Sequence, residues 1–235
     1  MEPRGASEMA GGPEHRALAV ETVPQSWRDV LVALEDRHAG RWRSGCGIDA
    51  VAIGRAAVLG LIGHSGRGGS TLAMQLVRSM RHLAPGADAS TLARLKRKML
   101  EIRHGAMLAC ALGGIRDPRF QRLLARHLPL VQGTPESRMG GALYGLGMAA
   151  QVLFGKRIGE LDLAEQAVLA AAVRRHVLLA PDDDADGIAL RSNRWEEVRA
   201  RAALGVRLAY GDEGEGVTEA LERLAAMAAP RAVLA

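Results

Sequence analysis

Aromatic residues are scarce in this chain of 235 residues, with three Trp, two Tyr and two Phe. Proteins that hold single-stranded nucleic acid commonly stack its bases on aromatic side chains, so the composition argues against such a platform. Cysteine is scarcer still. Cys46 and Cys110 are too few for a disulfide scaffold, and they lack the spacing of a metal-binding motif.

Long uncharged segments are also missing. The longest, residues 139–155, includes five glycines and is shorter than the roughly 20 apolar residues that a membrane-spanning helix needs. We therefore expect a buried helix of small residues over 140–153. The opening residues, MEPRGASEMAGG, lack the apolar core of a signal peptide.

Apolar residues at helical spacing are abundant, and hydrophobic residues make up 48% of the chain. Trp27, Val30, Leu31 and Leu34 share one helix face, which predicts a helix capped by Ser26. We find no strand-like alternation and no internal repeat, so the predicted fold is all-α. The predicted parts are a tail over residues 1–20, a helical domain over 21–210 and a C-terminal helical extension over 211–235.

Helix-capping residues and apolar residues at helical spacing predict the remaining helices. Asp49, Asp117 before Pro118, and Asp162 with Glu165 have the character of helix caps. An acidic loop over 181–186 precedes a charged helix near 193–210. The most regular apolar stripe consists of Leu92, Leu95, Met99, Ile102, Ala106 and Ala109.

Three segments combine polar side chains with helix ends, and the first is Glu35-Asp36 at the end of the first helix. Adjacent helical residues point about 100° apart, so one of the two carboxylates faces a given cleft. A carboxylate beside an apolar face is partly desolvated, which suits it to general acid or base chemistry. The alternative is an exposed acidic pair near a helix end.

The second segment, Gly68-Gly69-Ser70-Thr71, opens a helix that carries Gln75 and Arg78. Glycines let backbone N–H groups turn towards a ligand, and a helix N-terminus attracts anions, so the segment suits a phosphate or diphosphate. It is not a Walker loop, because no Gly-Lys-Ser/Thr follows at the required spacing. An ordinary glycine loop with a Ser/Thr cap is the alternative.

The third segment places Arg94, Arg97, Lys98 and Glu101 on one side of a helix. Its cations could clamp a diphosphate while the carboxylate acts nearby. The alternative is a solvated charged face with an Arg97–Glu101 pair.

In this order, the three segments resemble the motifs of the peptidoglycan glycosyltransferases, the transglycosylase domains of penicillin-binding proteins. The Met-Gln version of the second motif is most similar to the penicillin-binding protein 1C branch. The resemblance covers roughly residues 20–210. It rests on Glu35-Asp36-Arg37, Gly69-Ser70-Thr71-Leu72-Ala73-Met74-Gln75-Leu76-Val77-Arg78, Arg97-Lys98-Met99-Leu100-Glu101, and the later runs over 143–156 and 160–171.

The resemblance implies a lysozyme-like, two-lobed helical fold and a reaction that polymerises lipid II with inversion, releasing undecaprenyl diphosphate. Glu35 would take the proton from the 4-hydroxyl of the acceptor sugar. Glu101 would assist at the diphosphate, alone or by holding a divalent cation (Mg²⁺ or Mn²⁺). The remaining expected roles are substrate binding by Asp36, Ser70, Thr71 and Gln75, and charge neutralisation at the leaving group by Arg78, Arg97 and Lys98.

The partners implied are lipid II, the growing glycan strand, the membrane surface and a cell-wall synthase, with a location at the periplasmic side of the inner membrane. Two alternatives stay open. One is a non-catalytic relative that binds lipid-linked intermediates or a synthase partner, because His38-Ala39-Gly40 and residues 126–130 depart from the first and fourth family motifs. The other is a basic helical nucleic-acid binder, which the small net charge of +5 disfavours.

Overall fold

The computed structural model describes residues 22–36, 70–80, 90–133, 142–179, 185–214 and 216–229. These residues form a mostly helical structure, which confirms the predicted fold class. The elements are α1 (Gln25–Glu35), α3 (Leu72–Met80), α4 (Thr91–Leu112), the 3-10 helix η1 (Gly114–Arg116), α5 (Pro118–His127), β1 (Pro129–Gly133), β2 (Ala142–Tyr144), α6 (Leu146–Phe154), the 3-10 helix η2 (Ile158–Glu160), α7 (Leu163–Ala172), β3 (Val177–Leu179), α8 (Ala185–Tyr210) and α9 (Val217–Ala226).

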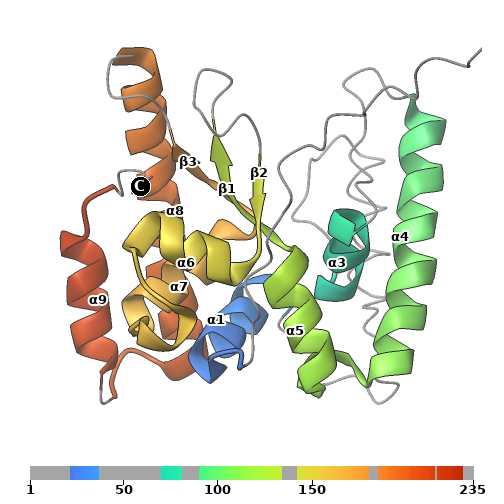
Figure 1. Cartoon of the computed structure of the whole chain (residues 1–235), viewed down its shortest axis with the longest axis horizontal. Coiled ribbons are helices and arrows are strands. Elements are labelled where there is room, and N and C mark those ends of the chain that lie inside the picture. The colour runs from blue at the N-terminus through green and yellow to red at the C-terminus, as the bar shows by residue number, and fades with distance from the viewer. Residues whose placement is uncertain are drawn as a thin grey trace, which may run out of the picture.

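Helix α7 is the centre of the first helical group, and α1, α6, α8 and α9 pack around it (Figure 1). All its residues from Ala164 to Ala172 are buried, as expected of a helix that is apolar on every side. The predicted capping box closes its N-terminus. The Glu165 N–H donates to Asp162 Oδ1 at 2.9 Å, and the Asp162 N–H donates to Glu165 Oε2 at 3.1 Å.

Helices α3, α4 and α5 form the second group, on the right of Figure 1, where α3 packs against both α4 and α5. Helix α5 begins as its cap predicts, with Pro118 in the first turn and Asp117 accepting a bond from the Arg119 N–H at 2.7 Å. Phe120 of α5 is buried in the same continuous core as Trp27 of α1. The two groups therefore share one core.

A short three-stranded sheet lies beside the helices, so the prediction of no strands was wrong. The strand order is β2-β1-β3, with β1 antiparallel to β2 and parallel to β3. The strands are too short to show alternation in the sequence. Because β2 shows no alternation, the sequence prediction places a helix over 140–153. The observed helix begins later, at Leu146, after β2 and a turn at Gly145 with φ 93°.

Two other predicted helix starts are corrected. Helix α1 begins at Gln25 after Pro24, so Ser26 is not its cap, and the Ser26 hydroxyl instead donates to Gln166 of α7. The charged helix α8 begins at Ala185, within the segment predicted to be an acidic loop. The helix predicted after Asp49 and the tail over 1–20 lie outside the described residues.

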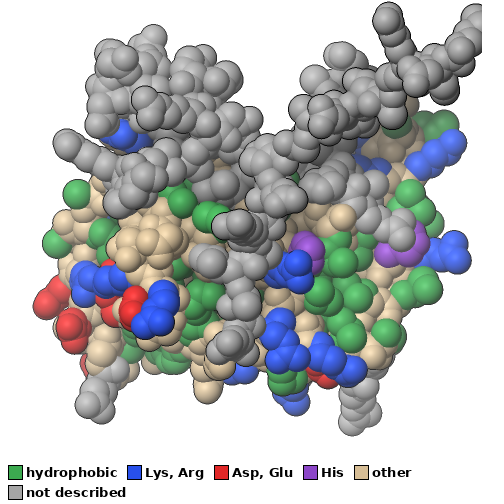
Figure 2. All heavy atoms as spheres, in the orientation of Figure 1, with side chains coloured by type: hydrophobic (Ala, Val, Ile, Leu, Met, Phe, Trp, Pro, Cys, Tyr) green, Lys and Arg blue, Asp and Glu red, His purple; other side chains and the backbone are tan. Residues whose placement is uncertain are grey.

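The apolar stripe predicted on α4 faces largely outward. Leu92, Leu95 and Met99 are each more than half exposed, and Figure 2 shows hydrophobic side chains at the surface over α4, among Lys and Arg. Helix α4 packs on α3 through a different face, which carries the buried residues Glu101 and Gly105. Glu101 of the charged segment therefore points inward, Arg94 is exposed, and Ala109 is the fully buried member of the stripe.

Candidate active site

Glu35 is the last residue of α1, and its side chain is only 1% exposed. Its Oε2 accepts a hydrogen bond from Gln75 Nε2 of α3 at 3.1 Å. Its Oε1 forms a salt bridge with Arg201 Nη2 of α8. Three segments remote in the sequence thus hold one carboxylate, and Arg201 neutralises its charge.

Close packing between α1 and α8 brings Arg201 to this carboxylate. A Cβ added at Gly205 would lie 2.7 Å from Val30 and 2.9 Å from Leu34. Since Arg201 precedes Gly205 by four residues, both lie on the same face of α8, and Leu34 is the neighbour of Glu35. The absence of a side chain at Gly205 permits the approach that forms the salt bridge.

Asp36 and Thr71 hold the start of α3. The Leu72 N–H donates to Asp36 Oδ2 at 3.3 Å, and the Met74 N–H donates to the Thr71 hydroxyl at 3.4 Å. Both side chains therefore satisfy N–H groups in the first turn, and the Asp36 carboxylate also complements the helix dipole. The Asp36 bond ties the end of α1, with Glu35, to the start of α3.

The second predicted carboxylate, Glu101, has a fully buried side chain surrounded by three cations. Arg78 binds both of its oxygens at 2.9 Å, in the two-pronged geometry that favours strong pairing. Arg97 donates at 3.1 Å and Lys98 at 3.2 Å, and Lys98 also donates to the Ser70 hydroxyl. Ser70 and Arg78 of the second segment thus form one cluster with Arg97, Lys98 and Glu101 of the third, and the cluster has excess positive charge.

Burial and charge have opposite effects on the pKa values in this cluster. Burial by itself would raise the pKa of Glu101, but the hydrogen bonds and charges of Arg78 and Lys98 outweigh it and bring the pKa below its usual value. Burial lowers the pKa of Lys98, Glu101 opposes that shift, and Arg78 and Arg97 add to it. Glu101 is therefore an anion at neutral pH.

The packing of α3 on α4 positions this cluster. A Cβ added at Gly105 would lie 3.1 Å from the Met74 backbone nitrogen, so the two helices are nearly in backbone contact there. Glu101 lies one turn before Gly105, and Arg78 lies one turn after Met74. The crossing therefore places the carboxylate and the guanidinium opposite each other.

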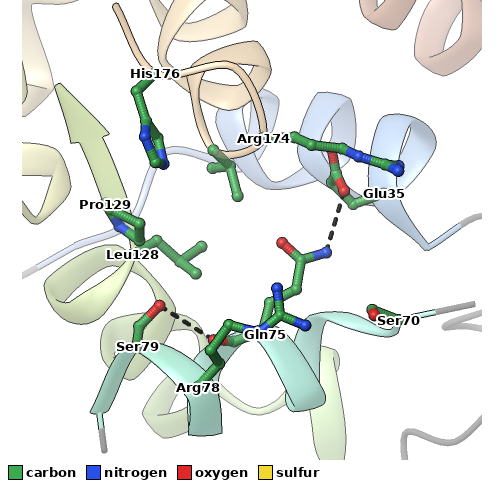
Figure 3. Close-up of a pocket in the computed structure, with 10 residues that line it drawn as sticks. Glu35, Ser70, Gln75, Arg78, Ser79, Leu128, Pro129, Arg174 and His176 are labelled. Atoms are coloured by element: carbon green, nitrogen blue, oxygen red, sulfur yellow. Dashed lines mark hydrogen bonds between the residues drawn. The ribbon is translucent and has the colours of Figure 1, made fainter. Parts of the chain in front are cut away.

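A cavity of about 280 Å³ separates α3 from the first helical group. Figure 3 shows Ser70, Gln75, Arg78 and Ser79 along α3, with Glu35 and Arg174 facing them. Its full described lining is Glu35, Ser70, Gln75, Arg78, Ser79, Leu128, Pro129, Val173, Arg174 and His176. The predicted site residues outside this lining are Asp36, Thr71, Arg97, Lys98 and Glu101. Glu101 contributes indirectly, because it binds the lining residue Arg78.

Sequence reasoning did not single out Ser79, Arg174, His176 and Arg201. The basic run Arg174-Arg175-His176 directly after an apolar helix was the available signal for two of them. Nothing local marks Arg201, because its role depends on the approach of α8 to α1. Residues 126–130, read as the remnant of a motif, supply Leu128 and Pro129 to the lining.

Residues 6–201 of this chain match the protein family described as Transglycosylase. The chain belongs to that family. It is 30% identical to penicillin-binding protein 1A of Escherichia coli over 154 residues, 65% of this chain and 16% of the relative. For penicillin-binding protein 1A of Aquifex aeolicus the identity is 32% over 155 residues, 66% of this chain and 18% of the relative. For that of Mycolicibacterium smegmatis it is 29% over 182 residues, 77% of this chain and 20% of the relative.

This transglycosylase-family chain therefore spans about a fifth or less of the length of these relatives. The three relatives carry the 1A name, and assignment to the 1C branch stays a prediction. Within the described ranges, no helix combines the length and the apolar character needed to cross a membrane. The departures around His38-Ala39-Gly40 lie outside the described residues.

The divalent cation suggested for the diphosphate does not fit Glu101 as the structure has it. Both carboxylate oxygens already accept bonds from Arg78, Arg97 and Lys98. Among the residues that the structure describes, no group of three His, Cys, Asp or Glu side chains could hold a metal ion. The cations of the cluster occupy the place that a metal would take beside this carboxylate.

Proposed function

We propose that this chain is a peptidoglycan glycosyltransferase that polymerises lipid II with inversion and releases undecaprenyl diphosphate. One observation carries the proposal: the buried carboxylate of Glu35 lines the same cavity as Arg78, which belongs to a cluster of three cations. The cavity thus has a proton acceptor on one side and, on the other, positive charge that could bind an anion. Membership of the transglycosylase family supports this reaction class.

In the proposed reaction, Glu35 accepts the proton of the 4-hydroxyl of the acceptor sugar. The hydroxyl oxygen attacks the anomeric carbon of the donor from the side opposite the diphosphate, and the new bond forms with inversion. The electron pair of the broken bond leaves with the diphosphate. Gln75 and Arg201 keep the carboxylate in position, since general-base catalysis requires a fixed geometry at hydrogen-bond distance.

Arg78 faces the leaving diphosphate from the cavity wall, and Lys98 and Arg97 extend the positive charge behind it. Fixed cations stabilise charge that develops in the transition state without reorganising. We assign Glu101 a positioning role, because it holds all three cations and is itself fully buried. Any divalent cation would be bound through the diphosphate itself.

The cavity favours transfer with a charged leaving group over glycoside hydrolysis. Glycoside hydrolases generally use two carboxyl groups, one of which protonates the leaving oxygen. Among the described lining residues, Glu35 is the one carboxylate. A diphosphate held by cations needs no proton from a second acid, so one base and one cationic site suffice.

We also propose that the protein works at the periplasmic face of the inner membrane, on lipid-linked substrate and in contact with a cell-wall synthase. The exposed apolar side chains of α4 support a membrane surface as a partner. Lys96 and Arg103 on the same helix are suited to anionic headgroups.

A second candidate function is binding of lipid-linked intermediates without turnover. It is favoured by the engagement of both Glu35 oxygens, one by Gln75 and the other by Arg201. In that case the carboxylate would be a structural element of a binding site.

Polymerisation of purified lipid II into glycan strands tests the proposal. We expect the wild-type chain to form polymer and Glu35→Gln to reduce the rate by about 100-fold or more, the usual contribution of a general base. Glu222→Gln, which changes an exposed carboxylate on α9, is the matched control and should keep full activity. Tight binding of lipid II without polymer would support the second candidate instead.

A further inference from the structure

His176 is the strongest feature of the cavity that the proposed reaction leaves without a role. It lies directly before β3 and lines the same cavity as Glu35. Parallel pairing of β3 with β1, in which Val131 is opposite Val177, holds its backbone. Figure 3 shows its ring pointing into the cavity from the side that also carries Arg174 and Glu35.

A neighbouring amide, that of Gln132, contacts the His176 ring. Nδ1 lies 3.4 Å from Gln132 Oε1. With the amide oxygen of Gln132 facing the ring, the contact is a hydrogen bond only when Nδ1 carries the hydrogen, because a carbonyl oxygen accepts. In the neutral ring, Nε2 is then a hydrogen-bond acceptor available to a ligand.

The surroundings of His176 keep the ring uncharged. Burial lowers the pKa of His176 below its usual value of 6.5, and the positive charge of Arg194 on α8 lowers it further. Nearby acidic groups are already paired. Arg194 of α8 acts on the ring, and the charged groups that line the same cavity are Glu35, Arg78 and Arg174. Glu35 is paired to Arg201, and Glu197 of α8 is paired to Arg175 at 3.4 Å and to Arg194 at 3.7 Å.

We propose that His176 is a positioning residue for the acceptor saccharide, accepting at Nε2 a hydrogen bond from one of its hydroxyl or amide N–H groups. The inference rests on the proposed function. A neutral acceptor atom has nothing to offer a diphosphate, which Arg78 and its cluster serve on the α3 side. It suits an uncharged donor group on the sugar whose 4-hydroxyl is directed to Glu35.

Substitution at His176 tests this role in an assay that supplies the donor and the acceptor substrate as two different molecules. The donor is lipid II blocked at its own 4-hydroxyl and kept at fixed concentration, and unblocked lipid II is the varied acceptor. His176→Leu removes the acceptor atom, and we expect its acceptor KM to rise about 10-fold, as for loss of one buried hydrogen bond. His176→Gln restores an amide oxygen near the position of Nε2 and should return most of the affinity.

The pH dependence separates this role from a purely structural one. Protonation makes Nε2 a donor, so the acceptor KM of the wild type should rise as the pH falls through the pKa of His176, which lies below 6.5, while that of His176→Gln stays flat. An unchanged KM in His176→Leu at pH 7.5, or identical pH profiles for wild type and His176→Gln, would overturn the inference.

Failure of the proposed function would look different, because the wild type itself would form no polymer. In that case, calorimetry measures the affinity of wild type, His176→Leu and His176→Gln for a water-soluble lipid II analogue. Weaker binding by His176→Leu with recovery in His176→Gln supports the contact. Equal binding by all three proteins rejects it.

Discussion

Arg201 forms a salt bridge with Glu35, although 166 positions separate the two residues in the sequence. The carboxylate is almost fully buried, and the guanidinium is about a quarter exposed. Helix α8 thus supplies a counter-charge to a carboxyl group that is poorly solvated. The relationship makes the base of the proposed reaction dependent on the packing of α8 against α1.

Arg201→Ala should therefore lower both stability and activity. Removing one partner of a buried pair leaves an uncompensated charge, which costs about 3 kcal/mol of unfolding free energy. We expect urea denaturation to show a loss of that order and glycan synthesis to fall by at least 10-fold. Arg201→Lys retains a cation and should recover part of both, whereas a fully active Arg201→Ala would show that Glu35 needs no counter-charge.

Gly205→Ala tests whether close helix packing sets this geometry. The added Cβ would lie under 3 Å from the Val30 and Leu34 side chains, so these side chains, or α1 with them, must shift. Overpacking of this kind costs about 1–3 kcal/mol, and we expect a lower melting temperature together with weaker glycan synthesis. Gly159→Ala is the matched control, because nothing lies within 4 Å of its added Cβ. Equal effects of the two substitutions would contradict the assignment.

Glu101→Gln should destabilise the fold in a pH-dependent way. The substitution leaves Arg78, Arg97 and Lys98 close together without their shared anion, at a cost of about 3 kcal/mol. The folded pKa of Glu101 lies below its usual 4.5, so the ion pairs stabilise the fold fully above about pH 4.5. This contribution is lost as the pH falls through the folded value.

Chemical denaturation of wild type and Glu101→Gln across this range provides the measurement. The difference in unfolding free energy should be constant near neutral pH and should shrink under acidic conditions. A difference that grows on acidification would mean that Glu101 is protonated in the folded protein at neutral pH.

The exposed apolar side chains of α4 predict membrane association. Replacing Leu95 and Met99 by Gln should lower the affinity for anionic lipid vesicles, measured by co-sedimentation, by about 100-fold, since each apolar side chain withdrawn from a lipid surface loses about 1.5 kcal/mol or more. The melting temperature should barely change, because both side chains are more than half exposed. Leu190→Gln on α8, which is similarly exposed, serves as the control; an equal loss there would argue against a specific face.

Local signals in the sequence were sufficient for several elements. The cap at Asp117-Pro118 and the capping box of Asp162 and Glu165 predict the starts of α5 and α7 correctly, because each involves contacts within a few residues. The ordered motifs likewise led to the transglycosylase family, now confirmed. Strands β2 and β3 escaped prediction because their pairing with β1 depends on distant partners.

The choice of Glu35, Ser70, Gln75 and Arg78 as site residues came from motifs that are contiguous in the chain, and these four do line one cavity. Arg201 and His176 could not be found in this way, because their neighbours at the cavity come from other elements. Helix α4 shows the same limit: Leu92, Leu95 and Met99 of its regular apolar stripe are exposed, while Glu101 is buried and paired with Arg78, Arg97 and Lys98. Spacing along a helix defines a face, but which face is buried depends on the charges and small residues that the neighbouring helix presents.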